Sequence, residues 1–174
     1  MKTLISALAL AIGLGSTAAL AQDPADLNDL EIAHVAYTAD NIDIRYAHLA
    51  LALSSNPEVR TFANTMISDH EAVNAAALAL LDKLGASAQD NFLSQTLNQN
   101  AEKIIDGFVE LRGAEFDKAY AANELAYHQA VNDLVANVFI PNIDHPEVKA
   151  LFEQGLEIFR VHETHAEMMV EQLK

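Results

Sequence analysis

The stretch SNPEVRTFANTMISDHEAVN, residues 55–74, decides the fold class because it contains the start of a helix together with its apolar face. Asn56 is a natural N-cap, and Pro57 fits the first helical position, where a missing N–H does no harm. The apolar residues that follow recur at every third or fourth position, as on one face of a helix. This helix is expected to end near Gly85, which can adopt a left-handed C-cap.

The same periodicity continues through the chain, whereas strand signals are weak. Aromatic residues make up only 6% of the sequence, and two prolines in FIPNIDHPEV interrupt the pattern before the last segment. The sequence therefore predicts an all-α fold: an antiparallel four-helix bundle with an additional helical segment between its second and third long helices. The expected segments span residues 26–54, 57–85, 92–113 (the additional segment), 114–138 and 146–173.

The first 21 residues have the features of a secretory signal peptide. Lys2 precedes an apolar run, and residues 19–21 match the A-x-A cleavage pattern. A membrane helix is the alternative, but the run is short, contains glycine and is followed by the cleavage pattern. Cleavage after Ala21 leaves residues 22–174, a length that suits a single helical-bundle domain. The leader predicts a periplasmic or extracellular protein.

Composition and charge restrict the partners of this protein. The absence of cysteine excludes disulfides and metal sites with cysteine ligands. The formal charge of −15 opposes binding to nucleic acid and to anionic lipid. After the leader, no stretch of sequence is long and apolar enough to span a bilayer. We therefore expect no nucleic-acid partner and no membrane insertion, and the sequence names no protein partner.

Four polar residues adjoin the apolar stripes, one on each long expected helix: Asp43, His70, His128 and His162. Each lies three or four residues from an apolar position, so each can face inward. Helical bundles build metal sites from carboxylate and imidazole groups that converge from several helices. The alternative for any single histidine is a partly buried side chain with ordinary hydrogen-bond partners.

Three further residues are secondary metal-ligand candidates. Met66 lies four residues before His70, while His165 and Met169 follow His162 by three and seven residues. Thioether groups would add soft ligands, although methionines at helical spacing more often fill a core. The whole set predicts a transition metal ion, with copper or zinc favoured over iron.

A carboxylate-bridged di-iron site requires Glu-x-x-His pairs, and these are missing. The residues three positions before the three candidate histidines are all apolar: Ile67, Leu125 and Phe159. Only Glu124 lies close, four positions before His128. Hydrolase motifs are also missing, since there is no G-x-S-x-G and HETH is not H-E-x-x-H. We therefore expect no catalytic residue.

Three runs of the sequence resemble a bacterial family of exported proteins: SNPEVRTFANTMISDHEAVN, LRGAEFDKAYAANELAYHQAV and LEIFRVHETHAEM. The family is called domain of unknown function 4142, and the resemblance covers residues 26–169 approximately. It implies membership of the ferritin-like superfamily, hence a ferritin-like four-helix bundle, and an exported or outer-membrane protein. No established activity accompanies it.

The resemblance also assigns family positions to individual residues of this chain. The family's first-helix acid, its Asp-His pair, its third-helix histidine and its last histidine correspond to Asp43, Asp69 with His70, His128 and His162. Two departures stand out. Glutamate is usual at the position of Asp43, and Leu156-Glu157 stands where the family has leucine-proline.

Two functions from different classes follow from these observations. The first is a periplasmic metal-binding or metal-buffering protein. The alternative is a non-catalytic envelope or stress-related interaction protein whose histidines are structural. An oxygen- or peroxide-reactive ferritin relative is disfavoured because the Glu-x-x-His pairs are missing. Convergence of Asp43, His70, His128 and His162 within about 5 Å would favour the metal protein, since ligand bonds are ~2 Å long.

Overall fold

The computed structural model describes residues 22–174, and these residues form helices joined by short links, which confirms the all-α fold class. The expected signal peptide, residues 1–21, lies outside the described range. The long helices are α1 (Asp29–Leu53), α2 (Pro57–Lys83), α3 (Phe92–Phe108), α4 (Gly113–Leu134) and α6 (Pro146–Gln172). The shorter elements are η1 (Pro24–Asp26), the π-helical turn η2 (Val135–Phe139) and α5 (Ile140–Asn142).

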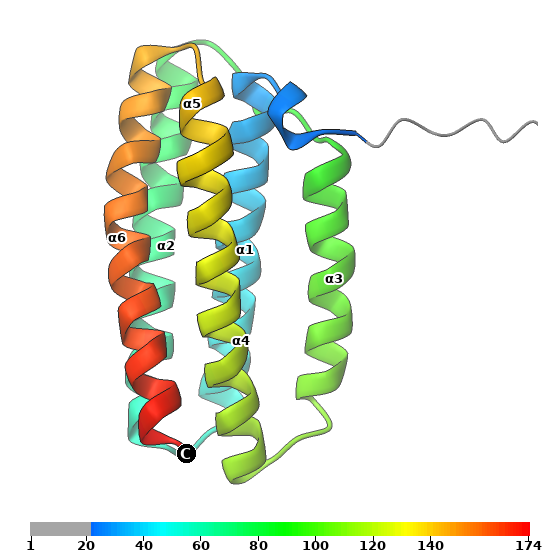
Figure 1. Ribbon diagram of the computed structural model, residues 1–174, viewed down its shortest axis with the longest axis vertical. Coiled ribbons are helices and arrows are strands. Elements are labelled where there is room, and N and C mark those ends of the chain that lie inside the picture. Colours follow the sequence, from blue (N-terminus) through cyan, green and yellow to red (C-terminus); the bar gives the residue numbers. More distant parts are fainter. Residues whose placement is uncertain (1–21) are drawn as a thin grey trace, which may run out of the picture.

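Four of the long helices lie side by side (Figure 1). Helix α1 packs along α2, and α4 packs along α6, while α2–α6 and α1–α4 contacts join the two pairs. The partners in each of these contacts run in opposite directions (Figure 1). Helix α3 lies outside this group, packs mainly on α1, and carries the chain from the end of α2 to the start of α4. It is the additional segment expected at residues 92–113.

Two of the expected helix boundaries need correction. Helix α3 ends at Phe108, before Gly113. In the link that follows, the guanidinium of Arg112 donates hydrogen bonds to the carbonyls of Val109 and Leu111, which have no helical partner there. Gly113 does adopt a left-handed φ of 55°, but at the start of α4. Gly85 has a φ of 61°, as expected for the C-cap of α2.

The helix that was expected to stop at residue 138 continues past Pro141. Helix α4 runs into the π-helical turn η2, where the Ile140 N–H bonds to the Val135 carbonyl, and then into α5. Proline cannot donate a backbone hydrogen bond, and its ring crowds the preceding turn. A widened turn directly before Pro141 accommodates both effects, so the helical path extends to Asn142.

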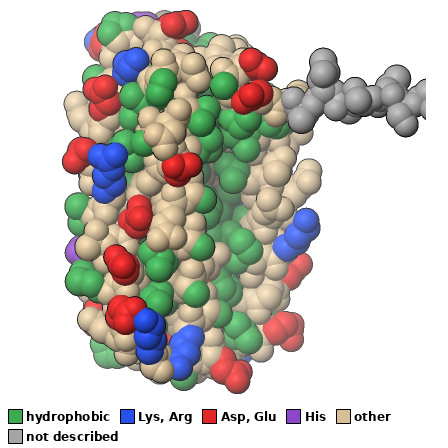
Figure 2. All heavy atoms as spheres, viewed as in Figure 1, with side chains coloured by type: hydrophobic (Ala, Val, Ile, Leu, Met, Phe, Trp, Pro, Cys, Tyr) green, Lys and Arg blue, Asp and Glu red, His purple; other side chains and the backbone are tan. Residues whose placement is uncertain are grey.

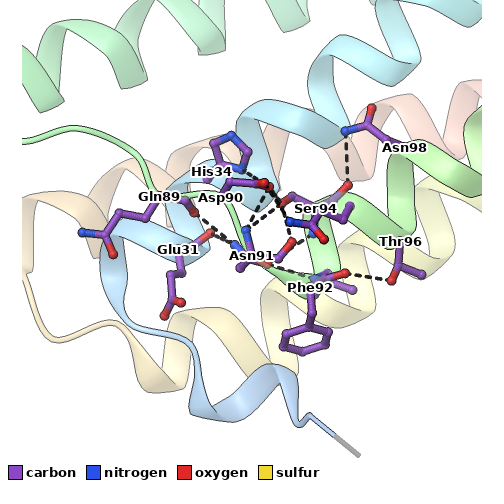
Figure 3. A network of polar contacts seen from close by, with 11 residues as sticks. Glu31, His34, Gln89, Asp90, Asn91, Phe92, Ser94, Thr96 and Asn98 are labelled. Atoms are coloured by element: carbon purple, nitrogen blue, oxygen red, sulfur yellow. Dashed lines mark hydrogen bonds and ion pairs between the residues drawn. The ribbon is translucent and has the colours of Figure 1, made fainter.

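The start of α3 is anchored to α1 by a polar network (Figure 3). Asn91 is the N-cap, and its side-chain oxygen accepts hydrogen bonds from the N–H groups of Leu93 and Ser94. Its side-chain amide donates to the backbone carbonyl of Glu31 in α1. One residue thus fixes both the beginning of α3 and its position on α1.

Two apolar clusters fill the interior, and a polar layer separates them. One cluster contains Ile32, Val35, Phe139 and Val148 from the end of the molecule where α1 and α6 begin. The other cluster occupies the opposite end: Tyr46, Val59, Phe62, Met66, Phe116, Tyr120, Ala166 and Met169. Between these two sets lie buried acids and histidines of four helices: Asp40, Asp43, His70, Glu124, His128 and His162. Within the described residues, no helix combines the length and the apolar character needed to cross a membrane.

Candidate metal centre

Asp43, His70, His128 and His162 meet between α1, α2, α4 and α6, and each is at most 4% exposed. One ring nitrogen of each histidine lies within 4.8 Å of those of the other two. Asp43 Oδ2 lies 2.6 Å from His70 Nε2 and 3.5 Å from His128 Nε2. The three histidines therefore converge, and Asp43 lies beside two of them, His70 and His128.

The opposite nitrogen of each histidine ring is held by an oxygen acceptor outside this group. The pairs are His70 Nδ1 with Asp40 Oδ1 at 2.8 Å, His128 Nδ1 with the Glu124 carbonyl at 2.9 Å, and His162 Nε2 with Asp69 Oδ2 at 2.9 Å. A carbonyl oxygen only accepts, so His128 carries its hydrogen on Nδ1 and presents a lone pair on Nε2. Metal-binding histidines in proteins are typically oriented in this way.

A stacked ring also holds the plane of His70. Phe159, one turn before His162 on α6, lies with its centroid 4.8 Å from that of His70 at an interplanar angle of 16°. The His128 and His162 rings cross at 87° with centroids 5.4 Å apart. The three imidazoles thus approach from different directions, as ligands around one point must.

Two imidazole nitrogens of the cluster, His128 Nε2 and His162 Nδ1, are buried and form no hydrogen bond within residues 22–174. The carboxyl groups of Asp43 and Glu124 are buried beside them, where Asp43 pairs with His70 and lies next to Glu124. An orphaned buried polar atom costs about 1–3 kcal/mol. A bound cation would satisfy the two nitrogens and the two buried carboxyl groups together.

Glu124 extends the cluster beyond the three histidines. It is completely buried on α4, and one of its oxygens lies within 4.8 Å of ligand atoms of Asp43 and His128. The donors therefore form two overlapping groups that share His128: one with three imidazoles, the other with two carboxylates. This arrangement offers both nitrogen and oxygen ligands to an ion.

The closest contact in the cluster joins His70 and Asp43. Their Nε2 and Oδ2 atoms are 2.6 Å apart, as in an ion pair. Burial alone would lower the pKa of His70, but the charge of Asp43 and the hydrogen bond from Asp40 outweigh it and raise this pKa to about 10. Burial opposes ionisation of Asp43, but the charge of His70 prevails and lowers its pKa. Without a metal, a proton on His70 balances the Asp43 charge.

The remaining groups favour their neutral forms. Burial lowers the pKa of His162 to about 4. The charges of His70 and His128 also lower it, whereas the hydrogen bond with Asp69 raises it. Burial also lowers the pKa of His128. Burial, followed by the charge of Asp43, raises the pKa of Glu124 well above its ordinary value. Two neutral imidazoles are thus available as ligands at neutral pH, because a ligand nitrogen must carry no proton.

The secondary candidates differ in burial. Met66 and Met169 are buried in the apolar cluster at the end of the molecule that contains Phe62 and Phe116. His165 is exposed, because the buried face of α6 passes from His162 to Ala166, four residues on. His165 is in neither of the two donor groups formed by the described histidines and acids.

Sequence reasoning did not assign the roles of three acids that shape the centre: Glu124 as a possible ligand, and Asp40 and Asp69 as partners of the histidines. Helical spacing carried a signal for the first two. Asp40 lies three residues before Asp43 and Glu124 four residues before His128, so each shares a face with a candidate ligand.

Comparison with known proteins supplies the family. The search of curated proteins found no match, and neither did the search of solved structures. A family model described as Domain of unknown function (DUF4142) matches residues 14–169. These residues include all four converging side chains and most of the described chain. The protein therefore belongs to the DUF4142 family.

Proposed function

We propose that this protein binds a transition metal ion between α1, α2, α4 and α6. His70, His128 and His162 would supply nitrogen ligands, and Asp43 a carboxylate, with Glu124 in reach as a further oxygen ligand. The supporting observation is the set of orphaned inner atoms, together with an oxygen acceptor behind each imidazole ring. A cation would replace the proton that the His70–Asp43 pair holds without it.

Zinc is the first candidate ion, and copper(II) is the second. Imidazole ligands suit zinc, copper, iron and nickel, whereas soft thioether ligands select Cu(I). Because Met66 and Met169 pack in an apolar cluster, the centre favours a borderline divalent ion over Cu(I). The two buried carboxylates make iron a stronger competitor than the missing Glu-x-x-His pairs alone would suggest.

The proposed role is metal binding or buffering in the cell envelope, within a ferritin-like arrangement of helices. The antiparallel packing of α1, α2, α4 and α6, with α3 as a long connection, supports the ferritin-like comparison. The leader sequence supports export. Intact-mass analysis of the protein from a periplasmic fraction is expected to give a chain that begins at Gln22. A full-length chain confined to the cytoplasm would contradict export.

A titration of the metal-free protein tests the proposed function. Zn²⁺, Cu²⁺ and Fe²⁺ are added to wild type, to His162→Ala and to His48→Ala, which removes an exposed histidine of α1. We expect saturable binding of at least one ion by wild type and by His48→Ala. His162→Ala should weaken it by tenfold or more, equivalent to about 1.4 kcal/mol. Equal curves for all three proteins would favour the alternative, an envelope interaction protein with structural histidines.

A further inference from the structure

An apolar cavity of about 170 Å³ lies beside the candidate metal centre. Its wall includes side chains from α1, α2, α3, α4 and α6, among them Val35, Ala77, Leu97, Val131, Phe152 and Phe159. The space-filling view shows a hollow with apolar side chains between α4 and α3 (Figure 2). Residues of α1 also line the cavity. An engineered dry cavity of similar size, about 150 Å³, holds a benzene molecule, so this volume suits a ligand with a six-membered ring.

One polar atom in this wall lacks a partner. Asn74 is 7% exposed, lines the cavity, and its side-chain oxygen forms no hydrogen bond with any described residue. Asp40 also lines the cavity, but its Oδ1 is engaged with His70. A buried amide oxygen without a donor is unfavourable, and a ligand that brings one donor would satisfy it. The cavity therefore presents an apolar surface with a single unmet hydrogen-bond requirement.

We propose that this cavity binds a small apolar molecule that carries one hydroxyl group, of the size and kind of phenol. The ring would fill the apolar space, and the hydroxyl would donate to the Asn74 amide oxygen. A hydroxyl both donates and accepts, so it can pair with either end of the amide. This is a second site, separate from the metal ligands.

The position of the cavity places this ligand next to the metal centre. Asp40 lies in the cavity wall and holds His70, while Phe159 lies in the same wall and stacks on the His70 ring. A bound ring would therefore touch the two side chains that fix the orientation of His70. The site itself needs no metal, because the proposed contacts are with apolar side chains of the wall and with the Asn74 amide.

Calorimetric titration with phenol and with benzene tests the proposal, on the full domain with and without Zn²⁺. The variants are Asn74→Leu, which removes the amide at similar size, and Ala130→Leu, which enlarges a side chain at the cavity wall. Ala126→Leu makes the same change one turn earlier on α4, at an exposed residue outside the cavity wall, and serves as control. Circular dichroism checks that each variant is folded.

We expect saturable phenol binding by wild type and Ala126→Leu, roughly three- to tenfold tighter than benzene binding. Asn74→Leu should abolish this preference for phenol while retaining benzene binding. Ala130→Leu should weaken both ligands. The result should hold without metal, which separates this site from the proposed metal function. No saturable binding, equal affinities of wild type for the two ligands, or an unchanged preference in Asn74→Leu would each overturn the proposal.

Discussion

Asp40 and Asp69 lie behind His70 and His162, on the side away from the candidate ion. Such acceptors fix the ring orientation and increase the basicity of the ligand nitrogen, and their loss typically weakens metal affinity by roughly 10–100-fold. We expect losses of that order in Asp40→Ala and Asp69→Ala, larger for Asp40 because its side chain is 7% exposed against 40% for Asp69. Competition with a chromophoric chelator measures the affinities.

Asp82→Ala provides the matched control for these two variants. Asp82 is an exposed acid near the end of α2, more than three turns beyond His70. The substitution removes the same charge at a distance from the ion, so the affinity should remain within about twofold of wild type. A loss as large as that of Asp40→Ala would show that overall charge, and not ring orientation, controls binding.

Glu124 should have opposite effects on stability and on metal binding. Its carboxyl group is completely buried next to the carboxyl group of Asp43. Glu124→Gln removes the buried acid, so the metal-free protein should become more stable by about 1–3 kcal/mol at neutral pH. The same change should weaken metal affinity, because an amide is a poorer ligand than a carboxylate. Urea unfolding in a chelator gives the first quantity, and titration the second.

The pH dependence of this variant has a definite sign. Burial holds the folded-state pKa of Glu124 above the ordinary value of 4.5, so this residue takes up a proton on folding when the pH exceeds 4.5. Its contribution to stability is present below that pH and is lost as the pH rises towards the folded-state pKa. The advantage of Glu124→Gln over wild type should therefore grow from about pH 5 to about pH 8. Glu115→Gln, at an exposed position of α4, should show no such growth.

Sequence analysis identified candidate ligands on four helices but not the full polar layer. Asp43, His70, His128 and His162 were recognisable because each adjoins an apolar stripe. The carboxylate of Glu124 was not assigned, because glutamate is rarely buried completely in a protein interior. Only the packing of α4 against its neighbours shows that this acid faces inward.

Among the elements, helix starts were easier to predict than helix ends. Asn56 caps α2 and Pro57 begins it, both as expected, because an N-cap side chain and a first-turn proline act locally. After the end of α3, the Arg112 side chain bonds to carbonyl groups of the link, a contact that a sequence pattern does not encode. The passage beyond Pro141 similarly depends on the widened turn η2.

The attachment of α3 to α1 should depend strongly on Asn91. Asn91→Ala removes two N-cap interactions and the bond to the Glu31 carbonyl, so the free energy of unfolding should fall by about 1–2 kcal/mol. Hydrogen exchange should accelerate most in α3. Asn100→Ala, at an exposed position within the same helix, should have almost no destabilising effect. An equal loss in both variants would show that the hydrogen bonds of Asn91 do not account for the effect.

At the scale of the whole molecule, the polar layer divides the interior into two apolar clusters. Four helices each contribute a polar side chain to this layer: Asp43 from α1, His70 from α2, His128 from α4 and His162 from α6. The chain has no cysteine for disulfides, so an ion in this layer would be its only cross-link between all four helices. The layer should therefore connect metal occupancy to global stability.

Metal addition should raise the thermal stability of the entire domain. An ion that binds only the folded state stabilises it by about 2.7 kcal/mol when its free concentration is 100 times Kd. For a domain of this size, that corresponds to an increase in Tm of roughly 5–10 °C. Calorimetry with Zn²⁺ should show this increase, and excess EDTA should reverse it.

The comparison with His162→Ala decides whether the increase arises at this centre. The variant lacks the α6 ligand, so the same Zn²⁺ concentration should raise its Tm far less, while His48→Ala should respond as wild type does. For each protein, the Tm with Zn²⁺ is compared with the Tm of the same protein in EDTA. This comparison removes the effect of the substitution on the stability of the metal-free fold. If Zn²⁺ raises the Tm of His162→Ala as much as that of wild type, the ion acts on the acidic surface and not through the polar layer between the helices.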